Sequence, residues 1–331
     1  MHASRGRSRR QVVQGMGAVG LALMAGCGRL PWQAESPPRI YRIGYLAGAA
    51  EHEARLAALR EGLSALGYVE GQNLVIEQRF GEGNNEALRE PARELARLGT
   101  EVLVVPSAAV ARVVQDTGSS IPVVVAGIGD PIASGVASSL AHPGGNVTGL
   151  ASPVLVGKSL QLLQEAAPAI SKVAVLMDAG TGPARIEPYA DDAQKLGLAV
   201  QPFLVQGAQE LDAVFAAVRA ADADAMYVTA GPTISTARAR IAELALQGGL
   251  PSVWVQQVYY PAGLMAYGPN SLAQYHGVAT YVDKLLKGAR ATELPIQYPT
   301  VFDFVINLKT AQALGLTIPQ HVLLQATEVI Q

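Results

Sequence analysis

Hydrophobic residues along the chain follow two spacings that alternate with each other. Short runs rich in valine, leucine and isoleucine predict β-strands, and longer segments with an apolar residue every three or four positions predict amphipathic helices. In the first half, strands are expected at residues 40–46, 73–80, 101–106 and 122–126, and helices at 51–66, 85–98 and 107–115.

Pro91 falls inside the second of these helices, where a proline costs about 3 kcal/mol. This helix therefore either starts late, with Pro91 in its first turn, or kinks.

The same alternation starts again in the second half of the chain. A short phrase is also repeated, because Ala65-Leu66-Gly67-Tyr68 and Lys195-Leu196-Gly197-Leu198 each precede a strand. A repeated βαβα pattern predicts an α/β protein with two doubly wound lobes, each built on a parallel sheet. The strands of the second half are expected at 172–178, 198–205, 224–230 and 251–255, and the helices at 183–196, 211–221 and 234–247.

Ligands on doubly wound sheets bind beyond the carboxyl ends of the strands. The candidate ligand-binding residues are therefore those that end the predicted strands. They are Ala47, Gly48, Ser107, Ala108, Ala109, Gly129, Asp130, Asp178, Thr229, Gln256 and Gln257.

Two of these strand ends carry specific chemistry. Ser107 precedes a predicted helix, so its hydroxyl and the backbone N–H groups of Ala108 and Ala109 can hold a ligand carboxylate, or Ser107 is an ordinary helix N-cap. Asp130 can pair with a ligand ammonium, or it caps a helix that has Pro131 at its first position.

The first 26 residues have the layout of an export signal. They contain four arginines and no acidic residue, followed by a short apolar stretch that ends near Ala25. That stretch has about 14 residues, whereas a membrane-spanning helix needs about 20. Residues 1–26 are therefore expected to be a signal, and the proline-containing residues 27–39 a tether.

Cys27 is the only cysteine in the 331 residues. Together with Ala25 and Gly26 it resembles the lipobox of bacterial lipoproteins, in which the cysteine is lipidated and becomes the new N-terminus. This resemblance implies a lipid anchor on a bacterial membrane, although Met24 stands where the pattern prefers leucine. The alternative is a chance cysteine behind a cleaved signal. Residues 8–13 also resemble a twin-arginine export signal, with Val12 and Val13 in place of its usual apolar pair.

Composition and charge narrow the class of protein. The part that follows the signal is long enough for two domains. Removing the four arginines of residues 1–26 leaves 21 basic against 27 acidic residues, a formal charge of −6. No basic stripe is present, so nucleic acid is not an expected partner.

Signatures of catalysis and cofactor binding are missing from the sequence. It contains no phosphate-binding G-x-x-x-x-G-K-[ST] loop, no G-x-S-x-G elbow, and no G-x-G-x-x-G after the first strand. The five histidines are scattered and do not have the spacing of a metal site. The sequence therefore predicts neither a cofactor nor a metal, and no enzyme.

Several stretches together resemble the substrate-binding lipoproteins of ABC transporters, in the branch with tryptophan- and tyrosine-type binding proteins. The resemblance implies a type I periplasmic-binding-protein fold, in which three crossovers join two lobes that close on a ligand like a hinge. The matching stretches are Gly129-Asp130-Pro131-Ile132 with Gly135, LAHPGGNVTGL at 140–150, GLMAYGPN at 263–270, LLKG at 285–288, NLKTA at 307–311 and ALGLTIP at 313–319.

The family fold implies a division of the chain. Lobe one would comprise residues 40–148 and 263–290, and lobe two residues 149–262 and 291–331. The crossovers would lie near residues 143–152, 257–264 and 295–306. Residues 263–288 would return to lobe one as a strand and a helix.

The resemblance also implies a binding mode. An amino acid, possibly aromatic or apolar, would place its carboxylate at Ser107–Ala109 and its ammonium at Asp130. The second lobe would close over it through Asp178, Thr229 and Gln256 or Gln257. The residues that could add an apolar wall are Tyr45, Trp254, Tyr259 and Tyr260, although the position of Trp254 within a strand favours the core for that residue.

Departures from the family lie in the second lobe. Relatives commonly have Asp-Pro where this chain has Gly231-Pro232, and asparagine where it has Asp178. They often have an acidic and an arginine side chain around residues 255–258, where this chain has Val-Gln-Gln-Val. The polar contacts of this lobe are therefore rewritten, and a ligand of another class is an open alternative.

The function expected from these features is that of a monomeric, extracytoplasmic receptor. It would hand a small ligand to an ABC permease in the inner membrane. Two alternatives are a ligand-sensing module of the same fold and an exported enzyme.

Overall fold

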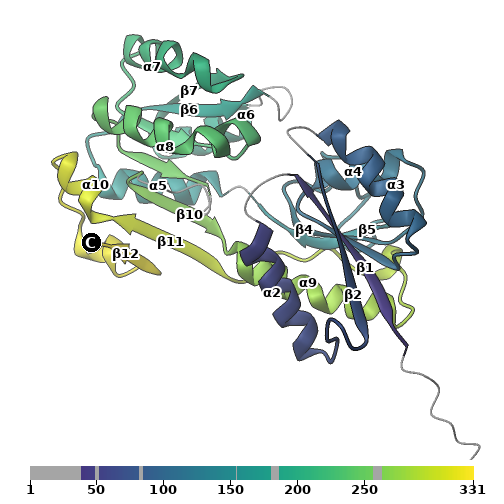
Figure 1. Cartoon of the computed structure of the whole chain (residues 1–331). Coiled ribbons are helices and arrows are strands. Elements are labelled where there is room, and N and C mark those ends of the chain that lie inside the picture. The colour runs from purple at the N-terminus through teal and green to yellow at the C-terminus, as the bar shows by residue number, and fades with distance from the viewer. Residues whose placement is uncertain (1–38, 49–51, 82–84, 154, 180–185, 256–262) are drawn as a thin grey trace, which may run out of the picture. The chain divides into compact units, whose positions relative to one another are not determined.

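The computed structural model describes residues 39–48, 52–81, 85–153, 155–179, 186–255 and 263–331. The compact part of the chain begins at Ile40, where the sequence pattern places the first strand. It contains two sheets, each with its own helices, which are described in turn below (Figure 1).

The first sheet has five strands that are all parallel, in the order β2-β1-β3-β4-β5. Four of these strands are predicted by the sequence pattern, and the fifth lies where the first crossover was expected. The glycine Gly149 interrupts the apolar run of β5, which explains why periodicity did not reveal this strand. The strands are β1 (Tyr41–Gly48), β2 (Leu74–Gly81), β3 (Val102–Val105), β4 (Val123–Ile128) and β5 (Val147–Ala151).

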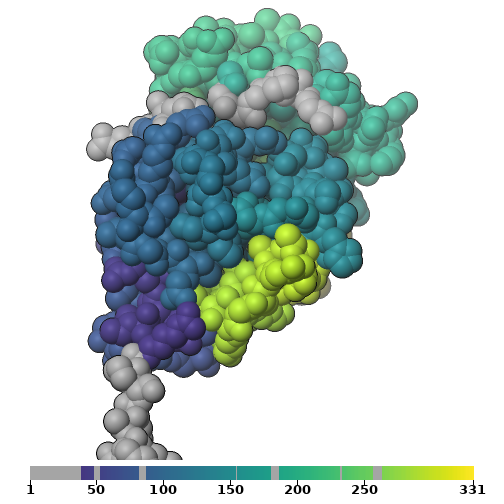
Figure 2. Space-filling view, turned by 90° about the vertical axis from the view of Figure 1, so that its right-hand side faces the viewer, coloured from purple at the N-terminus to yellow at the C-terminus, as the bar shows by residue number. Residues whose placement is uncertain are grey.

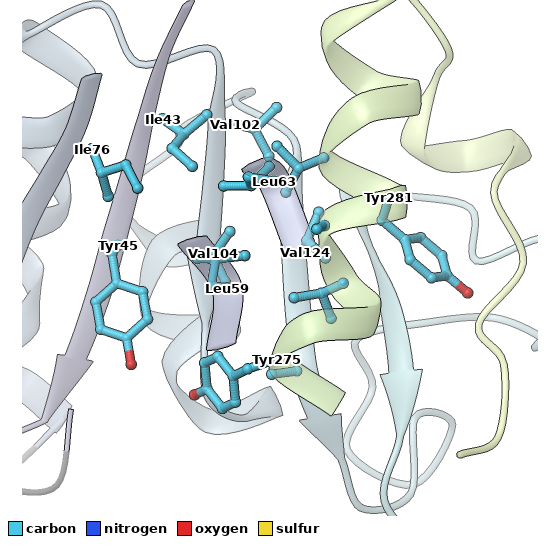
Figure 3. Packing of buried hydrophobic residues seen from close by; sticks show 14 of the residues in the cluster. Ile43, Tyr45, Leu59, Leu63, Ile76, Val102, Val104, Val124, Tyr275 and Tyr281 are labelled. Carbon is cyan, nitrogen blue, oxygen red and sulfur yellow. The ribbon is translucent and has the colours of Figure 1, made fainter. Parts of the chain in front are cut away.

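Helices cover both faces of the first sheet. On one face α2 (His52–Ala65) and α9 (Ser271–Leu286) pack against Ile43, Tyr45 and Val104 (Figure 3). The space-filling view shows the later part of the chain, in yellow-green, at the surface beside this early part (Figure 2). The other face is covered by the 3₁₀ turn η1 (Asn85–Leu88), α3 (Arg89–Arg97) and α4 (Ala108–Asp116).

Pro91 is the third residue of α3. A proline is tolerated in the first turn of a helix, because the N–H group that it lacks would have no partner there. The helix therefore starts late, which is the first of the two outcomes expected from the sequence.

The second sheet has seven strands in the order β12-β11-β10-β9-β8-β6-β7. Neighbouring strands are parallel except β10 and β11, which are antiparallel. The strands are β6 (Lys172–Asp178), β7 (Ala199–Val205), β8 (Ala225–Val228), β9 (Ser252–Trp254), β10 (Met265–Pro269), β11 (Phe302–Asn307) and β12 (Glu328–Ile330).

Two helical layers enclose the second sheet. One layer consists of α5 (Val156–Ala166), α6 (Glu187–Lys195), α10 (Leu308–Ala313) and α11 (Gln320–Leu323). The other layer consists of η3 (Ala208–Glu210), α7 (Leu211–Ala220) and α8 (Pro232–Gln247).

The strand expected to return to lobe one belongs to the second sheet instead. Within β10, Met265 pairs with Val253 of β9 and with Ile306 of β11. Four of the five residues of β10 are buried, because the strand has a neighbour on each side. The expected division at residue 263 is therefore wrong for the strand, whereas α9 does pack on the first sheet, as expected.

The boundary expected at residue 290 also differs in the structure. After η5 (Ala291–Glu293), Ile296 N–H donates to the Leu140 carbonyl oxygen at 2.8 Å. Ala151 N–H donates to the Gln297 carbonyl oxygen, also at 2.8 Å. Leu294 and Ile296 are buried with the first-sheet clusters, so apolar burial keeps this segment with the first sheet to Gln297.

Tyr281 on α9 binds this returning segment. Its hydroxyl donates to the Pro295 carbonyl oxygen at 3.0 Å and lies 3.1 Å from Gln297 Oε1. Burial raises the pKa of Tyr281 to about 12, so the phenol keeps its proton and remains a donor at neutral pH.

The contact between α2 and α9 leads to a stability prediction. A Cβ atom at Gly62 would lie 2.5 Å from the His276 carbonyl oxygen and 2.8 Å from Ala279 Cβ. Alanine normally stabilises a helix interior relative to glycine by up to about 1 kcal/mol. We expect Gly62→Ala to reverse that sign and to lower the free energy of unfolding by about 1–3 kcal/mol, because α9 must move away.

The matched control is Gly277→Ala on α9, where the nearest atom is Leu150 Cδ1 at 3.4 Å, an ordinary contact. Urea denaturation of both variants would measure the two free energies of unfolding. A Gly62→Ala protein as stable as the Gly277→Ala protein would contradict the close packing of these helices.

Candidate functional site

The candidate residues of the first sheet follow three adjacent strands. Ala47 and Gly48 end β1, Ser107 follows β3, and Gly129 and Asp130 follow β4. Because the strands are parallel, all three ends lie on one edge of the sheet, where doubly wound proteins bind ligands. The topology thus brings together residues that are more than 80 positions apart from first to last.

Ser107 is the N-cap of α4. Its backbone is extended, and its hydroxyl oxygen accepts a long hydrogen bond of 3.5 Å from Val110 N–H. The serine is half-buried, Ala108 is half-buried, and Ala109 is exposed. The N-cap interpretation is therefore correct, and it leaves open the second role, in which the first N–H groups of α4 bind an anion.

Asp130 caps a turn. Its Oδ1 accepts hydrogen bonds from Ile132 N–H at 3.0 Å and from Ala133 N–H at 2.9 Å. The residues after Pro131 form turns instead of the expected helix. Since Asp130 is exposed and uses only Oδ1 in these bonds, Oδ2 can still face a cation.

The second-sheet candidates also follow adjacent strands, since β6, β8 and β9 are neighbours. Thr229 follows β8 and is buried, and its hydroxyl donates to the Leu176 carbonyl oxygen at 3.0 Å. Gln256 and Gln257 lie just after β9 and fall outside the described residues, as do Tyr259 and Tyr260.

Asp178, at the end of β6, is only 2% exposed. Its Oδ2 accepts hydrogen bonds from Thr233 N–H at 2.6 Å and Ile234 N–H at 3.4 Å, at the start of α8. A carboxylate stabilises a helix N-terminus, because the N–H groups there lack partners and carry partial positive charge. In the structure, therefore, Asp178 joins β6 to α8.

Gly231 lies against this carboxylate. A Cβ atom at Gly231 would lie 2.3 Å from Asp178 Cβ and 2.5 Å from its Oδ2. Real Cβ atoms do not approach so closely, so a side chain at position 231 is incompatible with Asp178 in this position. The close approach of Asp178 therefore requires glycine at position 231 in this chain.

The aromatic candidates lie in the cores. Trp254 is fully buried, and its Nε1–H donates to Ser252 Oγ at 3.1 Å, which favours the core interpretation. Tyr45 is also fully buried, with its ring centroid 6.3 Å from that of Phe80 and 6.2 Å from that of Tyr275. Burial is the largest influence on the Tyr45 phenol and raises its pKa.

Sequence reasoning missed Arg55, which lies in the first turns of α2. Its Nε–H donates to Ser271 Oγ at 3.2 Å, and its Cζ lies 5.9 Å from the centroid of the Tyr275 ring. Both partners belong to α9, far along the chain, so no local pattern marks Arg55 as a site residue. Phe80, near the end of β2, is an exposed large hydrophobic side chain that the sequence pattern did not single out.

The described part of the chain contains no group of three or more histidine, cysteine, aspartate or glutamate residues placed to bind a metal ion. Within the same residues, no helix has the length and hydrophobicity needed to cross a bilayer.

The two parallel sheets, with candidate contacts at the ends of three adjacent strands in each, match a known family. Its model, described as ABC transporter substrate binding protein, covers residues 46–330. The chain belongs to this family. The resemblance seen in the sequence is thereby confirmed, and so is the two-lobed α/β fold. Proteins of this family are solute-binding proteins that act outside the cytoplasm with ABC permeases.

Individual relatives agree with this assignment. The tyrosine-binding protein of Clostridioides difficile strain R20291 is 20% identical to this substrate-binding protein over 313 residues, which is 91% of this chain and 90% of the relative. A conserved domain protein from Vibrio cholerae superposes with a TM-score of 0.81 at 25% identity. An ABC domain from Streptococcus pneumoniae in complex with L-Trp also gives 0.81, at 24% identity. Both solved structures cover 88% of this chain and match over their whole length.

The position of Asp178 leads to a second prediction. Asp178→Ala should lower the free energy of unfolding by about 1–2 kcal/mol, because the first N–H groups of α8 lose their acceptor in a buried place. Asp178→Asn keeps an acceptor oxygen while it removes the charge, so its loss should be smaller. Guanidinium denaturation would measure both losses. An alanine variant as stable as the wild type would refute the capping role.

Proposed function

We propose that this substrate-binding protein captures an amino acid and delivers it to an ABC permease. The observation that carries the proposal is the match to the family over residues 46–330, on a fold that presents two sets of parallel strand ends. The choice of an amino acid rests on two relatives, one named for tyrosine and one solved with L-Trp.

The binding residues follow from the strand ends. The ligand carboxylate is placed at the N–H groups that follow Ser107, and the ligand ammonium at Oδ2 of Asp130. From the second lobe, Thr229 and Gln256 or Gln257 close over the ligand, and Asp178 holds the start of α8 beside them. Binding and hinge closure are the whole mechanism, without any covalent step.

The location of the protein follows from its first residues. The basic and apolar segments before Cys27 direct export, and Cys27 carries a lipid that holds a monomer at the membrane. Residues 27–39 then serve as the tether. Arg9 and Arg10 support export by the twin-arginine route, which carries proteins across the membrane in the folded state.

The proposed ligand class can be tested directly by calorimetry. Protein produced from the full 331-residue sequence would be unfolded, washed, refolded and titrated with the common L-amino acids, starting with L-tryptophan and L-tyrosine. We expect at least one to bind with a Kd in the micromolar range or below. Failure of every amino acid to bind would contradict the proposal.

The variant Asp130→Asn makes this experiment residue-specific. Asparagine keeps an oxygen for the Ile132 and Ala133 N–H groups, so the turn survives and only the charge is lost. Affinity for the bound amino acid should fall about tenfold, because a charge-assisted hydrogen bond to the ammonium is lost. Affinity for the matching acid without an amino group should not change. An equal fall for both would remove Asp130 from the ammonium site.

The lipid anchor makes a separate prediction. Cys27→Ala should give a protein without lipid that is released from membranes in soluble form, because the cysteine sulfur is the attachment point. Mass spectrometry of the mature N-terminus and fractionation of the cells would measure this. A Cys27→Ala protein that still sediments with membranes would exclude the anchor at this residue.

A further inference from the structure

Arg55 differs from its neighbouring arginines in how its charge is matched. Arg42 pairs with Glu77, Arg60 pairs with Glu70, and Arg79 pairs with Glu94. Among the described residues, no carboxylate lies within salt-bridge distance of Arg55; Glu51, four positions earlier, falls outside them. Glu53, two positions earlier on α2, lies on another side of the helix, because residues at i and i+2 do not face each other.

The guanidinium group of Arg55 is held in place by uncharged groups. Nε donates to Ser271 Oγ at 3.2 Å, and the cation lies against the ring of Tyr275 at 5.9 Å from its centroid. Within the described part of the chain these contacts use one of the five N–H donors of the side chain, which leaves the two terminal NH₂ groups for another acceptor. Those groups form the planar fork that fits a carboxylate with two parallel hydrogen bonds.

The location of Arg55 is the one where a ligand is expected. It lies in the first turns of α2, directly after the carboxyl end of β1, and Ser271 begins α9 on the same face of the sheet. The hydroxyl groups of Tyr45 and Tyr275 lie toward the ends at which the strand arrows point (Figure 3). The half-buried cation is therefore at the ligand-binding edge of the first sheet.

Arg55 is half-buried and has no carboxylate partner among the described residues, so those surroundings gain little for stability. It loses part of its hydration, and an aromatic face and one hydroxyl replace that hydration only partly. An anionic group that arrives with a ligand would supply a charged partner. At the start of α4, the N–H groups that follow Ser107 could bind an anion, but they carry only the partial positive charge of a helix N-terminus. Arg55 carries a full positive charge.

We propose that Arg55 binds the carboxylate of the ligand together with the N–H groups that follow Ser107, so that the receptor selects solutes with a free carboxylate group. This inference rests on the proposed function, because it assigns one group of the proposed amino acid to one residue. It adds a specificity-determining side chain to the strand ends already described.

The test compares each ligand with its amide. Wild type, Arg55→Gln and Arg60→Gln proteins, each produced from the full sequence, would be titrated with L-tryptophan, L-tyrosine and L-phenylalanine and with the three matching amides. Arg60 lies on the same helix but pairs with Glu70, so it serves as the control for the loss of a positive charge. The measured quantity is the ratio of the affinities for acid and amide.

We expect the wild type and Arg60→Gln to prefer the acid by at least tenfold and Arg55→Gln to lose that preference. A purely structural role of Arg55 would weaken acid and amide equally and leave the ratio unchanged, which would overturn the proposal. Arg55→Lys should keep part of the preference, because the charge remains while the fork is lost.

Failure of this inference can be told apart from failure of the proposed function. Amino acids that bind with the same ratio in wild type and Arg55→Gln would overturn the role of Arg55 and leave the proposed function standing. If no amino acid binds, the proposed function falls, and Arg55 is judged by the same comparison with benzoate, succinate and indole-3-propionate and their amides. A wild type that binds none of these carboxylates would overturn both.

Discussion

The packing of α9 against α2 is the constraint on which the rest of the fold depends. The two helices cover one face of the first sheet together, and Gly62 lets their backbones approach closely. Because α9 follows β10 of the second sheet, the first hydrophobic core is complete only when the chain has passed through both sheets. The returning segment at Ile296 and Gln297 then closes the edge beside β5. The connections between the lobes are thus a consequence of how the first core is filled.

The same packing builds the edge on which the candidate site lies. It brings Ser271 and Tyr275 of α9 to Arg55 of α2, although more than 200 positions separate the two helices. Two other polar residues at the strand ends form local capping hydrogen bonds: Ser107 caps α4, and Asp130 caps a turn. In the proposed binding mode, a ligand would meet groups that already support the backbone, together with Arg55, which has no carboxylate partner among the described residues. Such double use of capping groups would keep the binding edge rigid without additional polar residues.

In the second lobe, Asp178 and Gly231 show how one close contact joins a strand end to the start of a helix. The carboxylate at 178 takes the space beside position 231 and accepts the N–H groups of α8. The negative charge at this helix start lies on β6, where it is buried and directed at the backbone. Replacing Asp178 would leave the first N–H groups of α8 without this acceptor.

The sequence by itself determined the alternation of strands and helices and the strand ends that could bind a ligand, because periodicity and capping are local properties of the chain. The family was indicated by the resemblance of stretches such as 140–150 and 263–270. The antiparallel pairing of β10 and β11 within the second sheet was not foreseen. The sequence also limited Pro91 to two outcomes, of which the late helix start is the one formed. The tertiary structure alone decided that β10 joins the second sheet and that residues to Gln297 remain with the first, because a buried strand is placed by its neighbours on both sides. It also decided the surroundings of Arg55 and the conflict between Asp178 and a side chain at position 231. Those features arise from contacts between segments far apart in the chain, and no local pattern of residues records them.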